Sequence, residues 1–142
     1  MAQAFLVGRI VVGCYYLYSA FKHLTNVSSM AAYAGSHGVP APELAIVGAG
    51  LLLAVAGVTL LLGLFPGIGV GALVLFFVPV TLIMHAFWAE SDPAQRTAQL
   101  IHFTKNLALL GSSVMFLAIP RPWPYSLERR LHLPIRATRA TV

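Results

Sequence analysis

Residues 42–84 read PELAIVGAGLLLAVAGVTLLLGLFPGIGVGALVLFFVPVTLIM, and Glu43 is the only charged residue in this run. Two long apolar stretches, about 42–64 and about 67–88, follow each other with a short uncharged turn at Leu64-Phe65-Pro66 between them. Each stretch holds roughly 20 residues, enough for a helix to cross about 30 Å of hydrocarbon. The run therefore predicts two transmembrane helices joined by a tight turn.

Two further apolar stretches flank this pair, at about 4–24 and about 99–119. Backbone groups cannot stay unpaired in lipid, so apolar spans are either helices or strands of a closed barrel. Barrel strands alternate polar and apolar residues, whereas residues 51–56 read LLLAVA. We therefore predict an all-α integral membrane protein, with a four-helix transmembrane domain over residues 1–120 and a basic cytoplasmic tail over residues 121–142.

The composition of the 142-residue chain agrees with a membrane domain, because 58% of its residues are hydrophobic and only 9% are charged. A soluble domain carries about a quarter charged residues. The single cysteine, Cys14, excludes an internal disulfide and a thiol relay of the C-x-x-C type. The composition thus excludes a soluble domain, a disordered chain and a secreted disulfide scaffold.

The first stretch could instead be a signal peptide, since Ala32-Tyr33-Ala34 has the small-x-small form of a cleavage site. However, the chain starts Met-Ala-Gln without a basic segment, and the apolar run is too long for a signal sequence. The run also ends at Lys22-His23, well before Ala34. We therefore interpret it as a retained span.

Helix-boundary signals agree with four helices. Pro42 followed by Glu43 is typical of a helix start. Asp92-Pro93-Ala94-Gln95 combines an acidic N-cap, a proline at N1 and a glutamine at N3, so the fourth helix should begin near Pro93. Pro79 lies inside the third span and is expected to kink it.

The charges are concentrated after residue 120, where five arginines meet only Glu128, so this tail carries +4 of the formal net charge of +5. Basic residues mark the cytoplasmic side of a membrane protein, and an even number of spans puts both termini on one side. We therefore predict cytoplasmic termini, with the connections at about 25–41 and 89–98 facing outward. Because the basic segment lies beside a membrane, nucleic acid is not an expected partner.

Two short segments outside the spans are predicted to lie at the membrane surface. The first is a helix over about 28–35, and the second is an amphipathic helix over 125–133 in the tail. Arg129 and Arg130 lie off the apolar side of the tail helix, and we expect them and Arg9 to contact anionic lipid or a partner. The aromatic residues expected as interfacial anchors are Trp88, Trp123 and Tyr125.

This topology collects polar residues at the outer ends of the spans. Positions 102, 105 and 106 share one face of helix four, and Ser113 continues that stripe. Arg9, Tyr16 and His23 are spaced by seven and share a face of helix one. The candidate site for a quinone or a partner consists of His23, His85, Asp92, His102, Lys105 and Asn106.

Simpler interpretations of these residues stay open. Lysines near helix ends, such as Lys22 and Lys105, often extend to the lipid headgroups. Facing histidines, here His85 and His102, can hold a haem iron, but neither lies near mid-membrane and we expect no haem. The sequence shows no metal-binding pattern, and Cys14 has no base beside it, so no catalytic residue is assigned.

The chain resembles the DoxX family in two places. Helices three and four carry His85-Ala86-Phe87-Trp88, then Asp92, then HFTKNLALLG at 102–111; helix one carries GRI at 8–10 and YSAFKH at 18–23. The similarity covers roughly residues 5–119, leaves out the basic tail, and implies a four-helix inner-membrane protein. The founding member of this family is a subunit of a thiosulfate:quinone oxidoreductase, and other members are linked to membrane redox complexes and oxidative stress.

Together, the residues and the resemblance predict a subunit of a quinone-linked redox complex in the bacterial inner membrane, not catalytic alone and without an intrinsic cofactor. In this role His85 or His102 exchanges a proton with a quinone or binds its carbonyl oxygen. Lys105 and Asn106 donate hydrogen bonds, and Asp92 organises the helix start. The alternative is a structural accessory subunit that packs on a larger membrane complex. A transporter or channel is less well supported, because four spans offer little room for a path across the membrane. The expected partners are the lipid bilayer and other membrane-protein subunits.

Reporter fusions at Gly35, Asp92 and Val142 test the predicted orientation. We expect the first two to report the periplasm or cell exterior and the third the cytoplasm, because the arginine-rich tail stays on the cytoplasmic side. Alkaline phosphatase and green fluorescent protein distinguish the two sides. A cytoplasmic signal from Gly35 or Asp92 would reverse the orientation.

Overall fold

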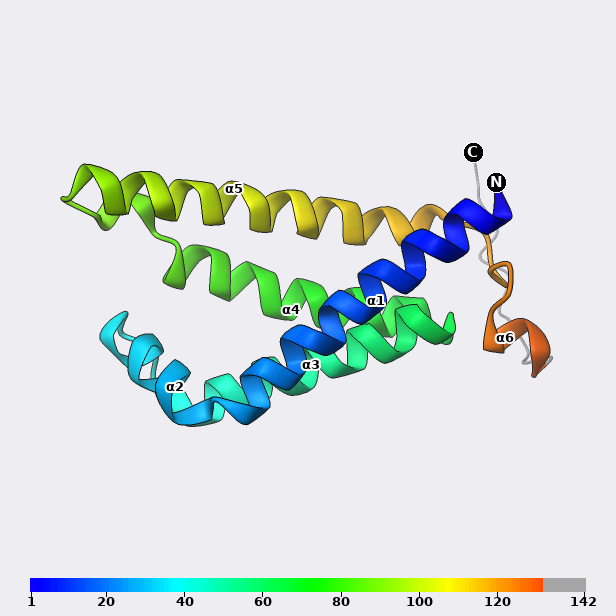
Figure 1. Cartoon of the computed structure of the whole chain (residues 1–142), viewed down its shortest axis with the longest axis horizontal. Coiled ribbons are helices and arrows are strands. Elements are labelled where there is room, and N and C mark those ends of the chain that lie inside the picture. Colours follow the sequence, from blue (N-terminus) through cyan, green and yellow to red (C-terminus); the bar gives the residue numbers. More distant parts are fainter. Residues whose placement is uncertain (132–142) are drawn as a thin grey trace.

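The structure, a computed structural model, describes residues 1–131, and this part of the chain contains helices and no strands. The elements are α1 (Ala2–Thr25), α2 (Val27–Ser36), α3 (Pro42–Leu62), α4 (Pro66–Met84), the 3₁₀ turn η1 (Phe87–Ala89), α5 (Pro93–Met115), the 3₁₀ turn η2 (Phe116–Ala118) and α6 (Leu127–Arg130) (Figure 1). Four of these segments are long and apolar enough to cross a membrane. The predicted all-α fold with four membrane-length helices is confirmed.

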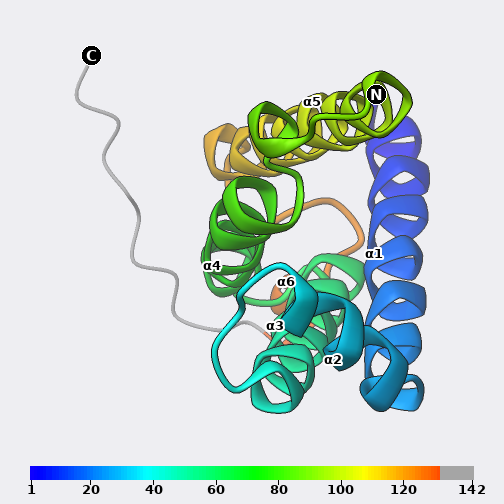
Figure 2. The same cartoon turned by 90° about the vertical axis from the view of Figure 1, so that its left-hand side faces the viewer.

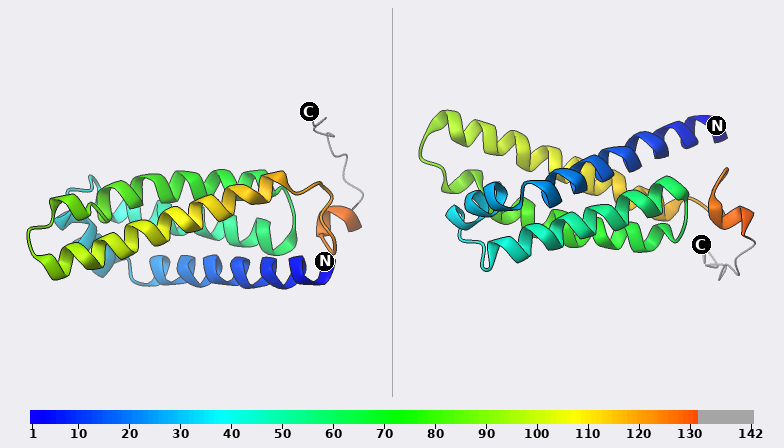
Figure 3. Two further views of the ribbon diagram at one scale, coloured as in Figure 1. Left: turned by 90° about the horizontal axis from the view of Figure 1, so that it is seen from above. Right: turned by 60° about the horizontal axis from the view of Figure 1, so that its bottom comes forward.

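The four long helices run back and forth along one axis, as Figures 1 and 3 show. α3 packs against both α1 and α4, and α4 packs against α5. α1 and α5 diverge towards the end where α2 lies, which Figure 2 shows end-on. We call the end that holds α2 and residues 85–92 the α2 end, and the opposite end, with Met1 and α6, the α6 end.

Most helix boundaries follow the sequence signals. Asp92 caps α5, because its side chain accepts a hydrogen bond of 2.8 Å from the backbone N–H of Gln95. α3 ends where Gly63 adopts a left-handed conformation with φ 63°. One boundary differs from the prediction: α4 ends at Met84 rather than near residue 88, and η1 follows. His85 leaves the helix with φ −122°, which frees its ring to contact α5.

α1 and α3 approach so closely that glycine is required at their crossing. A Cβ atom on Gly13 would lie 2.8 Å from the Cβ atom of Leu61 and 3.1 Å from its backbone nitrogen. On the facing helix, a Cβ atom on Gly57 would lie 2.7 Å from the Cγ atom of Leu17. Lipid gives membrane helices little hydrophobic reason to associate, so close van der Waals contact of this kind holds them together.

The segment after residue 120 folds back against the α6 end. Trp123 is fully buried, with its ring edge-on to Phe5 at a centroid distance of 5.1 Å and tilted against Phe116 at 5.5 Å. The prediction that Trp123 anchors the protein at the membrane interface is wrong, because the ring completes the hydrophobic core between α1 and η2. Residues 121–131 are thus part of the bundle's α6 end.

Arg9 holds the segment after residue 120 against the α6 end. Its guanidinium donates hydrogen bonds to the backbone oxygens of Pro124 at 3.3 Å and Tyr125 at 3.0 Å, and the residue is 2% exposed. The rings of Phe5 and Trp123 lie 6.0 and 5.9 Å from its central carbon. The prediction that Arg9 contacts lipid or a partner is therefore wrong: carbonyl groups of its own chain bind the charge.

A salt bridge between Arg121 and Glu128 holds the same segment in place. The buried carboxylate of Glu128 accepts hydrogen bonds from both Nε and Nη2 of Arg121, with the Nε–Oε2 distance at 3.0 Å. These bonds raise the pKa of the Arg121 guanidinium. α6 forms only part of the helix predicted over 125–133, and residues 132–142 lie outside the described residues. Arg129 and Arg130 are exposed, so their contact with lipid or a partner stays a prediction.

Gly13→Ala should destabilise the protein, because the added methyl group would overlap Leu61. Overpacking of this kind costs about 1–3 kcal/mol. Gly8→Ala is the matched control on α1, since a Cβ atom there meets nothing within 4 Å; it should be neutral or stabilising by up to about 1 kcal/mol. Thermal unfolding in mild detergent measures both variants, and equal melting temperatures would contradict the close contact.

Candidate functional site

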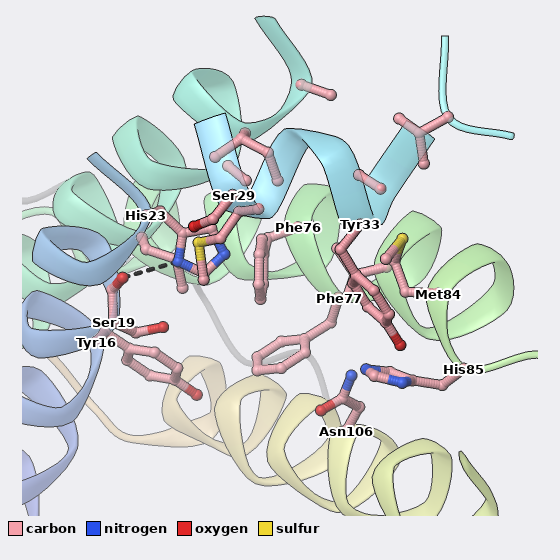
Figure 4. Close-up of a pocket in the computed structure, with 18 of the residues that line it drawn as sticks. Tyr16, Ser19, His23, Ser29, Tyr33, Phe76, Phe77, Met84, His85 and Asn106 are labelled. Carbon is pink, nitrogen blue, oxygen red and sulfur yellow. Dashed lines mark hydrogen bonds between the residues drawn. The ribbon is translucent and has the colours of Figure 1, made fainter. Parts of the chain in front are cut away.

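A cavity of ≈ 480 Å³ lies among the helices at the α2 end, and Figure 4 shows the side chains around it. Much of its wall is apolar, with Leu53 from α3 and Phe76 and Phe77 from α4. α2 closes it from outside, packing on α3 with Ala31 buried. The lining reaches Tyr16, nine residues before the end of α1, or about 14 Å along that helix. The cavity therefore extends from one end of the bundle towards its middle.

Three polar side chains that line this cavity, Asn106, Ser19 and Tyr15, make no side-chain hydrogen bond within residues 1–131, and Asn106 is the most buried of them. Its side chain is 7% exposed, points into the cavity, and makes no hydrogen bond within residues 1–131. Its amide atoms are not sealed inside the protein, as Arg9 Nε and Thr81 Oγ1 are, so they are open to whatever fills the cavity. An amide also offers both donors and an acceptor. Asn106 is thus placed to bind a polar ligand group.

Gln99 lies seven residues before Asn106 on the same face of α5, with the same 7% exposure, but both the oxygen and the nitrogen of its amide are hydrogen-bonded. Its Oε1 accepts a hydrogen bond from Nδ1 of His85 at 2.8 Å, and its Nε2 donates to the hydroxyl of Tyr33 at 3.4 Å. Because Nδ1 carries the proton of neutral His85, Nε2 of that ring is left as an acceptor. Tyr33 keeps its own proton to donate. This chain of bonds joins α2, the end of α4 and α5.

His23 lies on the other side of the cavity from His85 (Figure 4). Its Nδ1 donates to the backbone oxygen of Ser19 at 2.8 Å, so Nε2 is again left as an acceptor. Its ring stands edge-on to Phe76, with centroids 5.9 Å apart. The cavity therefore has an imidazole acceptor on each side of an aromatic wall.

A hydrogen bond between Tyr16 and Ser113 joins α1 to α5. Ser113 donates its only hydroxyl proton to the backbone oxygen of Leu109 at 2.7 Å. Tyr16 must therefore donate to Ser113 Oγ, at 3.1 Å. This bond connects the two helices at the inner part of the cavity, which Tyr16 also lines.

The structure divides the six predicted site residues into two groups. His23, His85 and Asn106 line the cavity, whereas Asp92, His102 and Lys105 do not. His102 is exposed and stacks on His85, with ring centroids 5.1 Å apart and planes 25° apart. Its Nδ1 accepts a hydrogen bond of 3.1 Å from Nζ of Lys105. Asp92 is exposed and engaged in the cap of α5.

Metal binding can be assessed in the described part of the chain. Within residues 1–131, no group of three or more His, Cys, Asp or Glu side chains could hold a metal ion. In the pair formed by His85 and His102 the ring faces meet, so their nitrogens do not converge on one point as ligation of a haem iron requires.

Gln99 and Tyr33 were not among the site residues predicted from the sequence. A signal for Gln99 existed: Gln99, Asn106 and Ser113 are spaced by seven, as are Arg9, Tyr16 and His23 on α1. All three side chains of this α5 stripe are buried. No comparable signal marks Tyr33, because its position depends on how α2 folds over the cavity.

Comparison with known proteins identifies the family. The family model DoxX matches residues 4–86, more than half of the chain. The chain belongs to the DoxX family. In this DoxX protein the matched segment supplies every residue that lines the cavity except Asn106. The chain is also similar to the inner membrane protein YphA of Escherichia coli (strain K12), with 27% identity over 125 residues, which are 88% of each chain. No solved structure matches.

Gln99→Leu should destabilise the protein, whereas Asn106→Leu should not. Both remove an equally buried amide from α5, but only the Gln99 amide is hydrogen-bonded. Gln99→Leu leaves His85 without its acceptor and should cost about 1–3 kcal/mol, whereas Asn106→Leu removes an unpaired group and should preserve or raise stability. Melting temperatures without added ligand measure this. Equal destabilisation would mean that Asn106 has a structural partner.

Proposed function

We propose that this DoxX protein binds the headgroup of a quinone in the cavity, as a subunit of a quinone-linked redox complex in the inner membrane. The observation that carries the proposal is Asn106, an amide with 7% exposure and no hydrogen bond within residues 1–131, beside His85 in a largely apolar cavity. Its amide atoms are open to the cavity and can form hydrogen bonds with a ligand that enters it.

The hydrogen-bonding groups suit both redox forms of a quinone. The carbonyl oxygens of the oxidised form need donors, and the amide of Asn106 and the hydroxyl of Tyr33 provide them. The hydroxyl groups of the reduced form need acceptors, which Nε2 of His23 and of His85 provide. The rings of Phe76 and its neighbours offer apolar aromatic contact to a flat ligand ring.

His85 links the cavity to the outer surface. One side of its ring lines the cavity, and the other stacks on His102, which is exposed. When a quinol is oxidised, it loses two protons and two electrons; Nε2 of His85 accepts one proton, and Nε2 of His23 accepts the other. The electrons go to a cofactor of another subunit, because this chain carries no cofactor motif of its own.

The orientation proposed with this function has both termini in the cytoplasm. The excess of arginine after residue 120 supports it. The cavity and His102 then lie on the outer side of the membrane. Arg129 and Arg130, both exposed on α6, face the cytoplasmic side and contact anionic lipid or a partner subunit.

Purification in mild detergent, followed by extraction and mass spectrometry, tests the function directly. The wild-type protein should co-purify with the host quinone, whereas Asn106→Leu and His85→Phe should lose most of it while staying at normal levels in the membrane. Thr104→Leu is the control on α5, because Thr104 is exposed and its hydroxyl bonds to the backbone oxygen of Leu100.

Two results would contradict the proposal. One is the absence of quinone from the wild-type preparation and from samples to which quinone has been added. The other is equal quinone content in all four proteins. Either result, with unchanged co-purifying subunits in every variant, would favour the alternative of a structural accessory subunit.

A further inference from the structure

A second, smaller hollow adjoins the cavity. It has a volume of ≈ 250 Å³ and lies between α3 and α4 near the α2 end. None of its lining residues has a polar side chain. The residues that line both hollows are Val39, Ala45, Ala49, Phe76, Val80 and Met84. We call this second hollow the α3–α4 groove.

The sequence explains why α3 and α4 leave a groove here. Near the α6 end they are in close contact, since a Cβ atom on Gly69 would lie 2.1 Å from Oγ1 of Thr59. In the groove, Gly48 of α3 has no side chain, and a Cβ atom there would meet nothing within 4 Å. Pro79 of α4 also lines the groove and has no backbone N–H to donate to the carbonyl of Leu75.

The groove also opens to the surface that lipid would cover. Leu75 and Ile83, which line it, are 65% and 42% exposed. A hydrocarbon chain lying there would touch apolar groups on both sides. The polar cavity, the shared wall and the groove thus form one path from Asn106 to the lipid-facing surface of α3 and α4.

We propose that the α3–α4 groove holds the hydrocarbon tail of a long-tailed quinone whose headgroup lies in the cavity, so that the ligand reaches the bilayer between α3 and α4. This inference rests on the proposed function and specifies its ligand as an amphiphile with an isoprenoid or alkyl tail. The shared wall joins the two parts, and its flexible Met84 side chain can move aside as the tail passes.

The other possible route runs between α1 and α5, where the helices diverge (Figure 2). The α1 side of the cavity carries Tyr15, Tyr16, Ser19 and His23. These polar groups suit a headgroup better than a hydrocarbon tail, because tail atoms would cover hydroxyl and imidazole groups without bonding them. The wholly apolar lining of the groove therefore favours the α3–α4 route.

Paired ligands on glycine variants test the tail route. Gly48→Leu places a side chain in the groove, and Gly71→Leu is the matched control, since a Cβ atom on Gly71 of α4 also meets nothing within 4 Å and Gly71 lines neither hollow. The probes are a decyl-substituted benzoquinone and the same ring without the decyl chain. Equilibrium binding to each purified protein is measured in one detergent, so that partition into micelles is common to all.

We expect Gly48→Leu to weaken binding of the decyl quinone on the order of tenfold relative to Gly71→Leu, because each buried methylene group contributes to affinity. Binding of the tail-less ring should be unchanged, which also shows that the variant is folded. Equal affinity of both variants for the decyl quinone would overturn the tail route while leaving the headgroup site intact. Failure of the wild-type protein to bind the tail-less ring, or binding that Asn106→Leu does not affect, would remove the headgroup site itself.

A photoreactive group at the end of the tail gives an independent readout on the wild-type protein. Cross-links to Leu75 or Ile83 support the α3–α4 route. Cross-links confined to α1, around Tyr15, would overturn it and assign the exit to the space between α1 and α5. Mass spectrometry of the labelled peptides separates these outcomes, because the two sites lie on different helices.

Discussion

Hydrocarbon offers no hydrogen bonds, and the arrangement of polar side chains in this protein follows from that constraint. Several hydroxyl groups inside the spans bond to their own helices, as Thr59 does to Val55, or across the bundle, as Tyr16 does to Ser113. Thr81 Oγ1 and Arg9 Nε are buried without a partner, but neither group lines the cavity. Asn106 differs because its unpaired amide faces a cavity that a ligand can enter. A polar group kept at such a place is evidence for binding rather than for stability.

The cavity is a product of unequal helix contacts. Gly13 and Gly57 bring α1 and α3 together, and Gly69 brings α4 against α3. α5 packs mainly on α4, and a hydrogen bond between Tyr16 and Ser113 connects it to α1. Towards the α2 end, α1 and α5 diverge (Figure 2). α2 then covers the opening from outside. Close glycine contacts thus join α1, α3 and α4, including Gly50 against Leu24 near the α2 end, whereas Gly111 of α5 makes no such contact.

At the α6 end, two charged side chains hold residues 121–131 against the bundle, and the pattern of four spans did not predict these contacts. Arg9 binds two carbonyl oxygens, and Arg121 binds the buried carboxylate of Glu128. Both charges are held by several hydrogen bonds, which a buried ion needs to offset its loss of water. The cavity lies at the opposite end of the bundle, the α2 end.

The sequence by itself determined the fold class, the four spans, the start of α5 at Pro93 and the presence of α2, because apolar length, N-caps and prolines act within one segment of chain. It also placed His23, His85 and Asn106 at the same end of the bundle. Only the tertiary structure decided that these three line a cavity while Lys105 and His102 stay outside it, that Gln99 and Tyr33 support His85, and that Arg9 turns to residues 124 and 125. Spacing along a helix fixes which residues share a face, but the partner of that face depends on how separate helices cross, and that is settled by contacts between segments far apart in the sequence.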